Sequence, residues 1–130
     1  MNPTAFLLLR LAIAASMFGH GLVRLPKLNG FSQWMVSCFE KSILPSALVI
    51  PFSYALPIAE FAIGLLLLIG LFTRVSLIAG GVMMIALILG TTLIENWEAL
   101  TSQLFHAAFF AVLLSFIQHN TLAVDNLLKK

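Results

Sequence analysis

Four uninterrupted apolar runs dominate the chain and determine its expected architecture. They extend roughly over residues 4–23, 52–72, 75–94 and 100–117. Each run is close to the about 20 residues that an α-helix needs to cross a hydrocarbon layer of about 30 Å. Short connections join the last three runs, so consecutive helices must pack antiparallel. The pattern predicts an all-α integral membrane protein, a single transmembrane domain over residues 1–130 that folds as an antiparallel four-helix bundle.

The connection between the first two runs has a different pattern over residues 30–41. Its apolar side chains recur at offsets of three and four, and polar side chains occupy the other face. The apolar set is Phe31, Trp34, Met35, Cys38 and Phe39. Such a segment is typical of a short amphipathic helix in the membrane interface, with Trp34 at the level of the lipid headgroups. We expect this helix to form a lid over one mouth of the bundle.

The first run resembles a secretory signal peptide in its apolar character but not in its charges. A signal peptide carries its positive charge before the apolar stretch. Here Arg10 lies inside the stretch, and Arg24 and Lys27 follow it. We therefore expect the segment to remain as the first membrane span.

Composition agrees with a lipid environment and excludes several classes of function. Hydrophobic residues make up 61% of the chain and charged residues 9%, whereas soluble domains carry charge on roughly a quarter of their residues. The net charge of +2 provides no polybasic patch, so we expect no nucleic-acid partner. The single cysteine, Cys38, allows neither an internal disulfide nor a cysteine metal cage.

The distribution of Lys and Arg near the span ends leaves the orientation balanced. The side with both termini holds Arg74, Lys129 and Lys130, and the opposite side holds Arg24, Lys27 and Lys41. Arg10 near the terminal side, together with Glu95 and Glu98 opposite, favours both termini in the cytoplasm.

Four ionisable residues fall inside the spans: Arg10, His20, Glu60 and His106. A charge at bilayer depth costs at least about 2.5 kcal/mol, so such side chains normally face the bundle interior and have partners. The helical rise places Arg10 and Glu60 at depths that differ by about 6 Å, which an arginine side chain can cover. We therefore predict an ion pair between Arg10 and Glu60.

The two histidines fall at matched depth near the lid. We predict a polar cluster of Glu60, His20 and His106 beneath the lid, with Arg10 deeper in the bundle. Pro57 lies one turn before Glu60 and frees a carbonyl there, because proline has no N–H. Gly64 and Gly70 in the same run, like Ala15 with Gly19 and Ser76 with Gly80 elsewhere, predict close helix packing.

Each of these residues also has a purely structural interpretation. The predicted ion pair serves helix register equally well, and each histidine can simply form interfacial hydrogen bonds. Ligation of a metal or haem by His20 and His106 is disfavoured, because no further ligands lie within reach. We expect no metal site, and we expect His119 to face water at the end of the last span.

Chemistry, if the chain performs any, must come from the embedded cluster. The sequence lacks the glycine-rich nucleotide-binding motifs, the HExxH zinc motif and the GxSxG nucleophile motif. Histidine, carboxylate and arginine beneath an apolar lid suit the polar head of an isoprenoid quinone, whose carbonyls they would bind and to which they would pass protons. The tail would lie among the phenylalanines. A quinone is therefore the candidate ligand.

At these residues the sequence resembles the DoxX family of small four-span bacterial membrane proteins. The matching features, in order, are Arg10, His20-Gly21, Lys27-Leu28, Pro57, Ala59-Glu60, Gly64, the turn from Gly70 to Arg74, and Leu122 to Asp125. The similarity covers nearly the whole chain, and the stretch from Glu60 to Arg74 is its most specific part.

The resemblance implies a multi-pass protein of the bacterial cytoplasmic (inner) membrane that is linked to redox processes. It also implies other membrane or redox subunits as partners and is compatible with an oligomer or with a subunit of a quinone-linked oxidoreductase complex. Two alternatives stay open: a non-catalytic scaffold or assembly subunit, and a carrier of small molecules or ions that uses the same cluster.

Overall fold

The computed structural model describes residues 1–128, so Lys129 and Lys130, two of the cations counted for orientation, lie outside the described part. The long helices, in order, are α1 (Pro3–Arg24), α2 (Leu28–Cys38), α3 (Ser46–Ile69), α4 (Thr73–Leu93) and α5 (Trp97–Ser115), and α6 (Val124–Leu128) is short. Short 3-10 helices occupy Leu25–Lys27 and Ile117–His119. Residues 1–128 contain no β-strand. The predicted all-α fold is confirmed.

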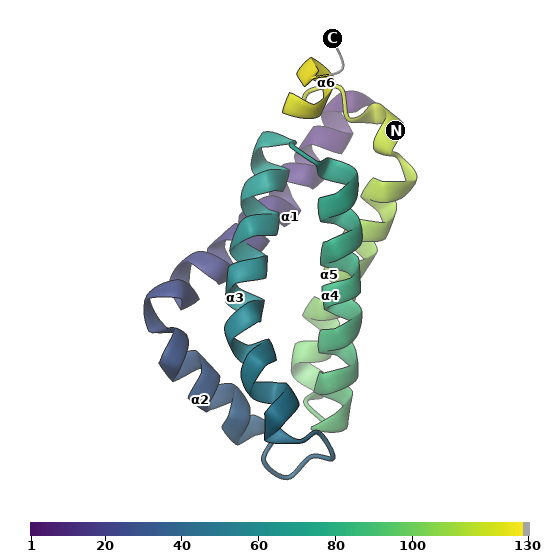
Figure 1. Cartoon of the computed structure of the whole chain (residues 1–130). Helices are drawn as coiled ribbons and strands as arrows, with labels where there is room; N and C mark the ends of the chain where they lie inside the picture. The colour runs from purple at the N-terminus through teal and green to yellow at the C-terminus, as the bar shows by residue number, and fades with distance from the viewer. Residues whose placement is uncertain (129–130) are drawn as a thin grey trace.

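Four segments are long and apolar enough to cross a membrane: Pro3–Cys38, Ser46–Ile69, Thr73–Leu93 and Trp97–Ser115. They run up and down as a bundle, with α1 packed against α3 and α4 packed against α5 (Figure 1). The N-terminus, α6 and the turn between α3 and α4 share one end, which we call the terminal end. The loop after α2 and the connection between α4 and α5 share the other, which we call the distal end. Large apolar side chains face outward along the spans, as expected in lipid.

Two glycines allow α1 and α3 to cross closely. A Cβ atom on Gly21 would collide with the backbone of Phe61, and one on Gly64 would collide with the backbone of Phe18. The predicted packing role of Gly64 is therefore confirmed, and Gly80 likewise leaves room for the ring of Phe110. The expected contact at Gly19 is wrong, because an added Cβ there would meet no atom within 4 Å. Gly21, two residues later and on the opposite side of α1, makes the close approach instead.

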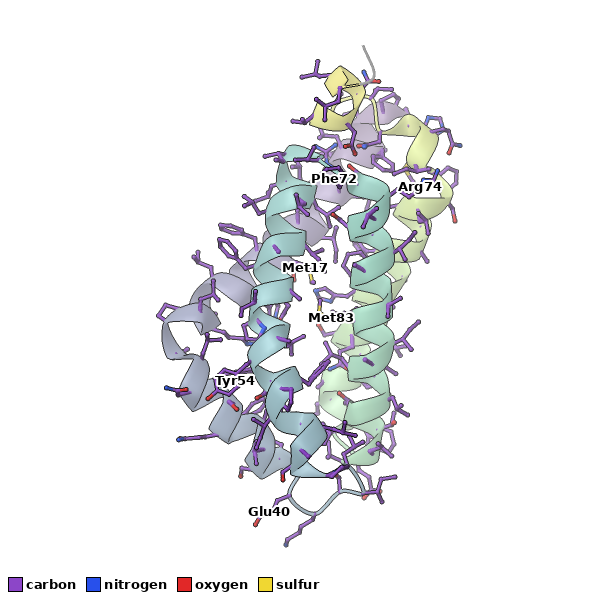
Figure 2. All side chains as sticks on the ribbon, viewed as in Figure 1. Met17, Glu40, Tyr54, Phe72, Arg74 and Met83 are labelled. Atoms are coloured by element: carbon purple, nitrogen blue, oxygen red, sulfur yellow. The ribbon has the colours of Figure 1, made fainter. Side chains whose placement is uncertain are left out.

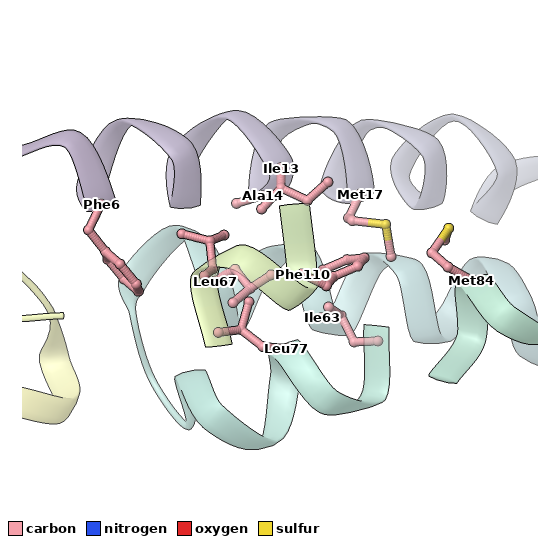
Figure 3. Packing of buried hydrophobic residues seen from close by; sticks show 10 residues of the cluster. Phe6, Ile13, Ala14, Met17, Ile63, Leu67, Leu77, Met84 and Phe110 are labelled. Atoms are coloured by element: carbon pink, nitrogen blue, oxygen red, sulfur yellow. The ribbon is translucent and has the colours of Figure 1, made fainter. Parts of the chain in front are cut away.

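Side chains from all four spans fill the half of the bundle nearer the terminal end (Figure 3). The buried apolar cluster consists of Phe6, Ile13, Ala14, Met17, Ile63, Leu67, Leu77, Met84, Phe110 and Leu113. The ring of Phe110 is 2% exposed and packs onto Gly80. This close packing joins the two helix pairs near the terminal end. A smaller cluster of Met35, Val49 and Leu56 joins α2 and α3 to α4 nearer the distal end.

Helix α2 follows α1 after a short 3-10 turn, where the chain bends back, and lies beside the first half of α3 (Figure 1). The hydroxyl groups of Ser32 and Ser53 lie 2.6 Å apart, and the Tyr54 hydroxyl donates to Asn29 Oδ1 at 2.7 Å. The 22 residues of α1 already extend about 33 Å, so α2 begins where the hydrocarbon layer would end. The segment is helical as predicted, but it forms a side wall along α3 and not a cap across the end of the bundle.

The second span begins earlier than the hydropathy pattern predicted. The helix starts at Ser46, six residues before the expected start at residue 52. Both Pro51 and Pro57 lie within it. Transmembrane helices tolerate proline where side-chain hydroxyls and neighbouring helices satisfy the backbone. Between the two prolines, the Ser53 hydroxyl donates to the Ile50 carbonyl at 2.6 Å.

Candidate functional site

A cavity of about 560 Å³ lies toward the distal end, between the pair α1–α3 and the pair α4–α5. Helix α2 closes one side, and its predicted apolar face, Phe31, Trp34, Met35, Cys38 and Phe39, lines the cavity. Met17 lies in the gap between α3 and α4 in Figure 2, at the inner end of the cavity. The cavity reaches the surface, because His20 and Trp34 line it and are both exposed.

One wall of this mainly apolar cavity holds most of its polar side chains. It consists of His20, Arg24, Glu60, Ser102, Gln103 and His106. These residues come from α1, α3 and α5, so the wall exists only when the spans are assembled. The remaining walls are mainly aromatic and aliphatic side chains of α2, α3 and α4, together with the polar residues Thr91 and Asn96.

Glu60 is the acidic group of the polar wall, and its partner is Arg24. The residue is 3% exposed, and Arg24 Nη1 donates to Glu60 Oε1 at 2.8 Å. The Arg24 guanidinium also lies over the ring of Phe31, with Cζ 4.5 Å from the ring centroid, a favourable cation–π geometry. Arg24 thus connects the end of α1, the middle of α3 and the wall helix α2.

The predicted ion pair between Arg10 and Glu60 is therefore wrong. Arg10 is 3% exposed, but its side chain extends toward the terminal end. Its Nε donates to the Leu67 carbonyl at 2.9 Å, and its Nη1 donates to Asn120 Oδ1 at 2.8 Å and to the Leu122 carbonyl at 3.0 Å. Long cationic side chains extend toward the nearer polar end of a span. The acceptors at that end belong to the end of α3 and to the segment after α5, and the comparison of helical depths took neither into account.

The two histidines face each other across the gap between α1 and α5. Their ring centroids lie 6.1 Å apart in an edge-to-face arrangement. Each Nδ1 contacts a carbonyl one turn earlier in its own helix: His20 contacts Ser16 at 2.6 Å, and His106 contacts Ser102 at 2.7 Å. A carbonyl oxygen only accepts hydrogen bonds, so both Nδ1 atoms carry the proton.

This tautomer leaves Nε2 of each neutral ring as a hydrogen-bond acceptor. The Ser16 hydroxyl lies 2.7 Å from His106 Nε2 and therefore donates to it. Among residues 1–128, no hydrogen bond to Nε2 of His20 is found. His20 thus presents an available acceptor at the cavity.

The structure brings Glu60, His20 and His106 to one cavity wall and separates Arg10 from them. Pro57 is buried within α3, one turn from Glu60. Trp34 is 57% exposed and lies where the wall helix meets the surroundings.

Gly70 ends α3 with φ of 73°, and Arg74 is exposed at the terminal end. His119 is half-buried and stacks near Phe116.

Sequence reasoning missed three residues that organise these contacts. Arg24 was interpreted only as a charge flanking the membrane, although it lies one turn after His20 and at the level of Glu60 once the helices cross at Gly21. Ser16 lies one turn before His20, a spacing that allows both to reach the same neighbour. Asp125 was seen only as part of a tail motif.

In residues 1–128, no group of three or more His, Cys, Asp or Glu could hold a metal ion.

Comparison with known proteins yields one match. A family model described as DoxX matches residues 5–94. This range contains α2 to α4 and all but the first two residues of α1. It therefore includes Arg24 and Glu60, whereas His106 on α5 lies beyond it. No curated protein and no solved structure matches the chain.

Proposed function

This chain is a multi-pass membrane protein that belongs to the DoxX family, and on that premise we propose that its cavity binds the polar head of an isoprenoid quinone. The proposal places the protein in a bacterial cytoplasmic membrane with both termini in the cytoplasm. There it serves as the membrane subunit through which partner redox proteins reach the quinone pool. The electron chemistry belongs to the partners, and this chain supplies the binding site.

The observation that carries the proposal is the cluster of ionisable side chains on one wall of a largely apolar cavity. A volume of about 560 Å³ lies within the roughly 300–1,000 Å³ typical of small-molecule pockets, which are mostly apolar with a few converging polar groups. An amphipathic ligand matches this division, with its ring at Glu60, Arg24 and His20 and its tail among the aromatic side chains of α2 and α3.

Access from the membrane also fits an isoprenoid ligand. His20 and Trp34 line the cavity and are exposed, and α1 contacts α5 less extensively than it contacts α3. A lipid-soluble molecule would enter sideways between helices without leaving the bilayer. The half of the bundle nearer the terminal end, filled by Phe110 and its neighbours, would stop the head from passing deeper.

The proposal is tested by extracting and identifying the lipids that co-purify with the full-length protein. We expect quinone in the wild-type extract by mass spectrometry. Replacing Ala99, which lines the cavity from α5, by Phe places a ring in the ligand space. We expect Ala99→Phe to reduce bound quinone at least about fivefold, since overpacking a site excludes its ligand.

Ala111→Phe provides the matched control, because Ala111 lies on the same helix, is exposed and is outside the cavity lining. It should retain wild-type quinone. Absence of quinone from wild type, even after quinone is added during purification, would contradict the proposal. Co-purification of a partner subunit without any ligand would then favour the scaffold alternative.

A further inference from the structure

Besides the buried Oε1 of Gln103, which has no hydrogen-bond partner within residues 1–128, two acceptors on the polar wall remain available to a ligand. Arg24 binds only Oε1 of the Glu60 carboxylate, and within residues 1–128 no other hydrogen bond to that carboxylate is found. The residue is 3% exposed and lines the cavity. Nε2 of His20 is the second, because the Ser16 carbonyl fixes the ring proton on Nδ1. Both groups need a hydrogen-bond donor, which a quinone ring with two carbonyls does not possess.

Donors in the same wall do not distinguish the two redox forms. The guanidinium of Arg24 has N–H groups beyond the one given to Glu60, and it can donate to a quinone carbonyl. The hydroxyl oxygen of a hydroquinone also accepts, so it satisfies the same donor. Only the acceptors discriminate, since they are satisfied by a hydroxyl and left unpaired by a carbonyl.

We propose that the cavity prefers the reduced, hydroquinone form of its ligand, because Glu60 and Nε2 of His20 accept hydrogen bonds from the ring hydroxyls. This inference rests on the proposed function, since it concerns the same site. Sites built to bind a ligand hydroxyl discriminate strongly against the analogue that lacks it, because their own polar groups stay unpaired. A partner enzyme would then deliver or withdraw the hydroquinone here.

The affinities of both forms can be compared with one fluorescent reporter. The chain has two tryptophans, Trp34 and Trp97, and only Trp34 lines the cavity. In full-length Trp97→Phe protein, Trp34 fluorescence is titrated without oxygen with decylubiquinone and, separately, with its hydroquinone. Work near pH 8 keeps an ordinary imidazole neutral. Half-saturating concentrations are compared, because the two forms quench to different extents.

We expect the hydroquinone to bind about tenfold more tightly than the quinone. Equal affinities, or tighter binding of the quinone, would overturn the inference and leave the proposed function intact. Failure of both forms to bind would instead overturn the proposed function. This comparison uses a protein with an unaltered polar wall, so it does not depend on how well a wall variant folds.

The role of His20 is tested separately. His20→Phe keeps a ring of similar size but removes the acceptor, so the preference should fall to about threefold, the part contributed by Glu60. His119→Phe is the matched control, because His119 lies in the 3-10 helix after α5 and outside the cavity lining, and it should retain the tenfold preference. An unchanged preference in His20→Phe would refute the assignment of the acceptor to His20.

Discussion

Arg10 is a buried cation whose charge is met entirely by acceptors near the terminal end. Its three hydrogen bonds reach the last turn of α3 and the segment after α5. Asn120, one of the acceptors, also donates to the Thr73 hydroxyl at 3.0 Å. A single side chain on α1 therefore joins the turn between α3 and α4 to the C-terminal segment.

Replacing Arg10 by Met should destabilise the protein by about 2–4 kcal/mol. The reason is that the substitution removes three hydrogen bonds and leaves the carbonyl of the buried Leu67 without this donor, and hydrogen bonds to charged groups contribute about 1.5–3 kcal/mol each. Equilibrium unfolding in mixed detergent micelles measures the change. Arg74→Met removes an exposed arginine at the same end and should shift the unfolding free energy by less than about 0.5 kcal/mol. Equal effects of the two variants would contradict the assigned role.

Individual ionisable residues were predictable as buried but not as paired. The cost of charge in lipid correctly places Arg10 and Glu60 inside the bundle, since each is 3% exposed. Partners depend on where long side chains extend and on where the helices cross. Gly21 and Gly64 set that crossing, and nothing in the sequence distinguishes Gly21 from Gly19 as the contact point. Arg24 therefore remained unrecognised as the partner of Glu60.

At the scale of a helix, α4 begins without a cap of its own. Phe72 precedes it in the left-handed conformation with φ of 49°, and its first turn contains no acidic residue. The Asp125 carboxylate supplies the missing acceptor from the C-terminal segment, because it receives the Phe72 N–H at 2.7 Å and the Thr73 N–H at 2.8 Å. A carboxylate at this position also stabilises the positive end of the helix dipole.

Asp125→Ala should therefore cost about 1–2 kcal/mol, the range measured for helix N-caps. The loss should be local, so hydrogen exchange followed by mass spectrometry should speed up at the amides of the first turn of α4. Asn126→Ala serves as the control, since its side chain makes no hydrogen bond to that turn. Unchanged exchange in the first turn of α4 would show that the cap is dispensable.

The existence of the helices was easier to predict than their ends. Hydropathy measures how well a segment suits lipid, so it found all four spans. It missed the first six residues of α3, from Ser46, because Pro45 and Pro51 interrupt the apolar run while the helix itself continues through Pro51. The spacing of apolar residues also correctly predicted that α2 is helical and which of its faces is apolar. The placement of α2 beside α3 depends on contacts such as Ser32 with Ser53, which no local pattern encodes.

At the scale of the whole molecule, the interior of the bundle changes along its length from a filled core to a cavity. Phe110 and its neighbours hold the two helix pairs together toward the terminal end, and the pairs enclose the cavity toward the distal end. The ion pair of Arg24 with Glu60 lies at this transition. It contributes to stability by joining α1 to α3 and contributes a polar wall to the proposed quinone site. These two roles can be separated.

Arg24→Met should destabilise the protein by about 2–3 kcal/mol, because it leaves a buried carboxylate without its cation. The double variant Arg24→Met with Glu60→Leu removes both charges, and apolar replacement of a buried pair is often neutral, so most of the lost stability should return. Unfolding in mixed micelles measures the coupling between the two sites. If the polar wall binds ligand, the restored double variant should still lack quinone. A double variant that regains both stability and bound quinone would show that the pair serves packing alone, and the ligand head would then have to lie elsewhere.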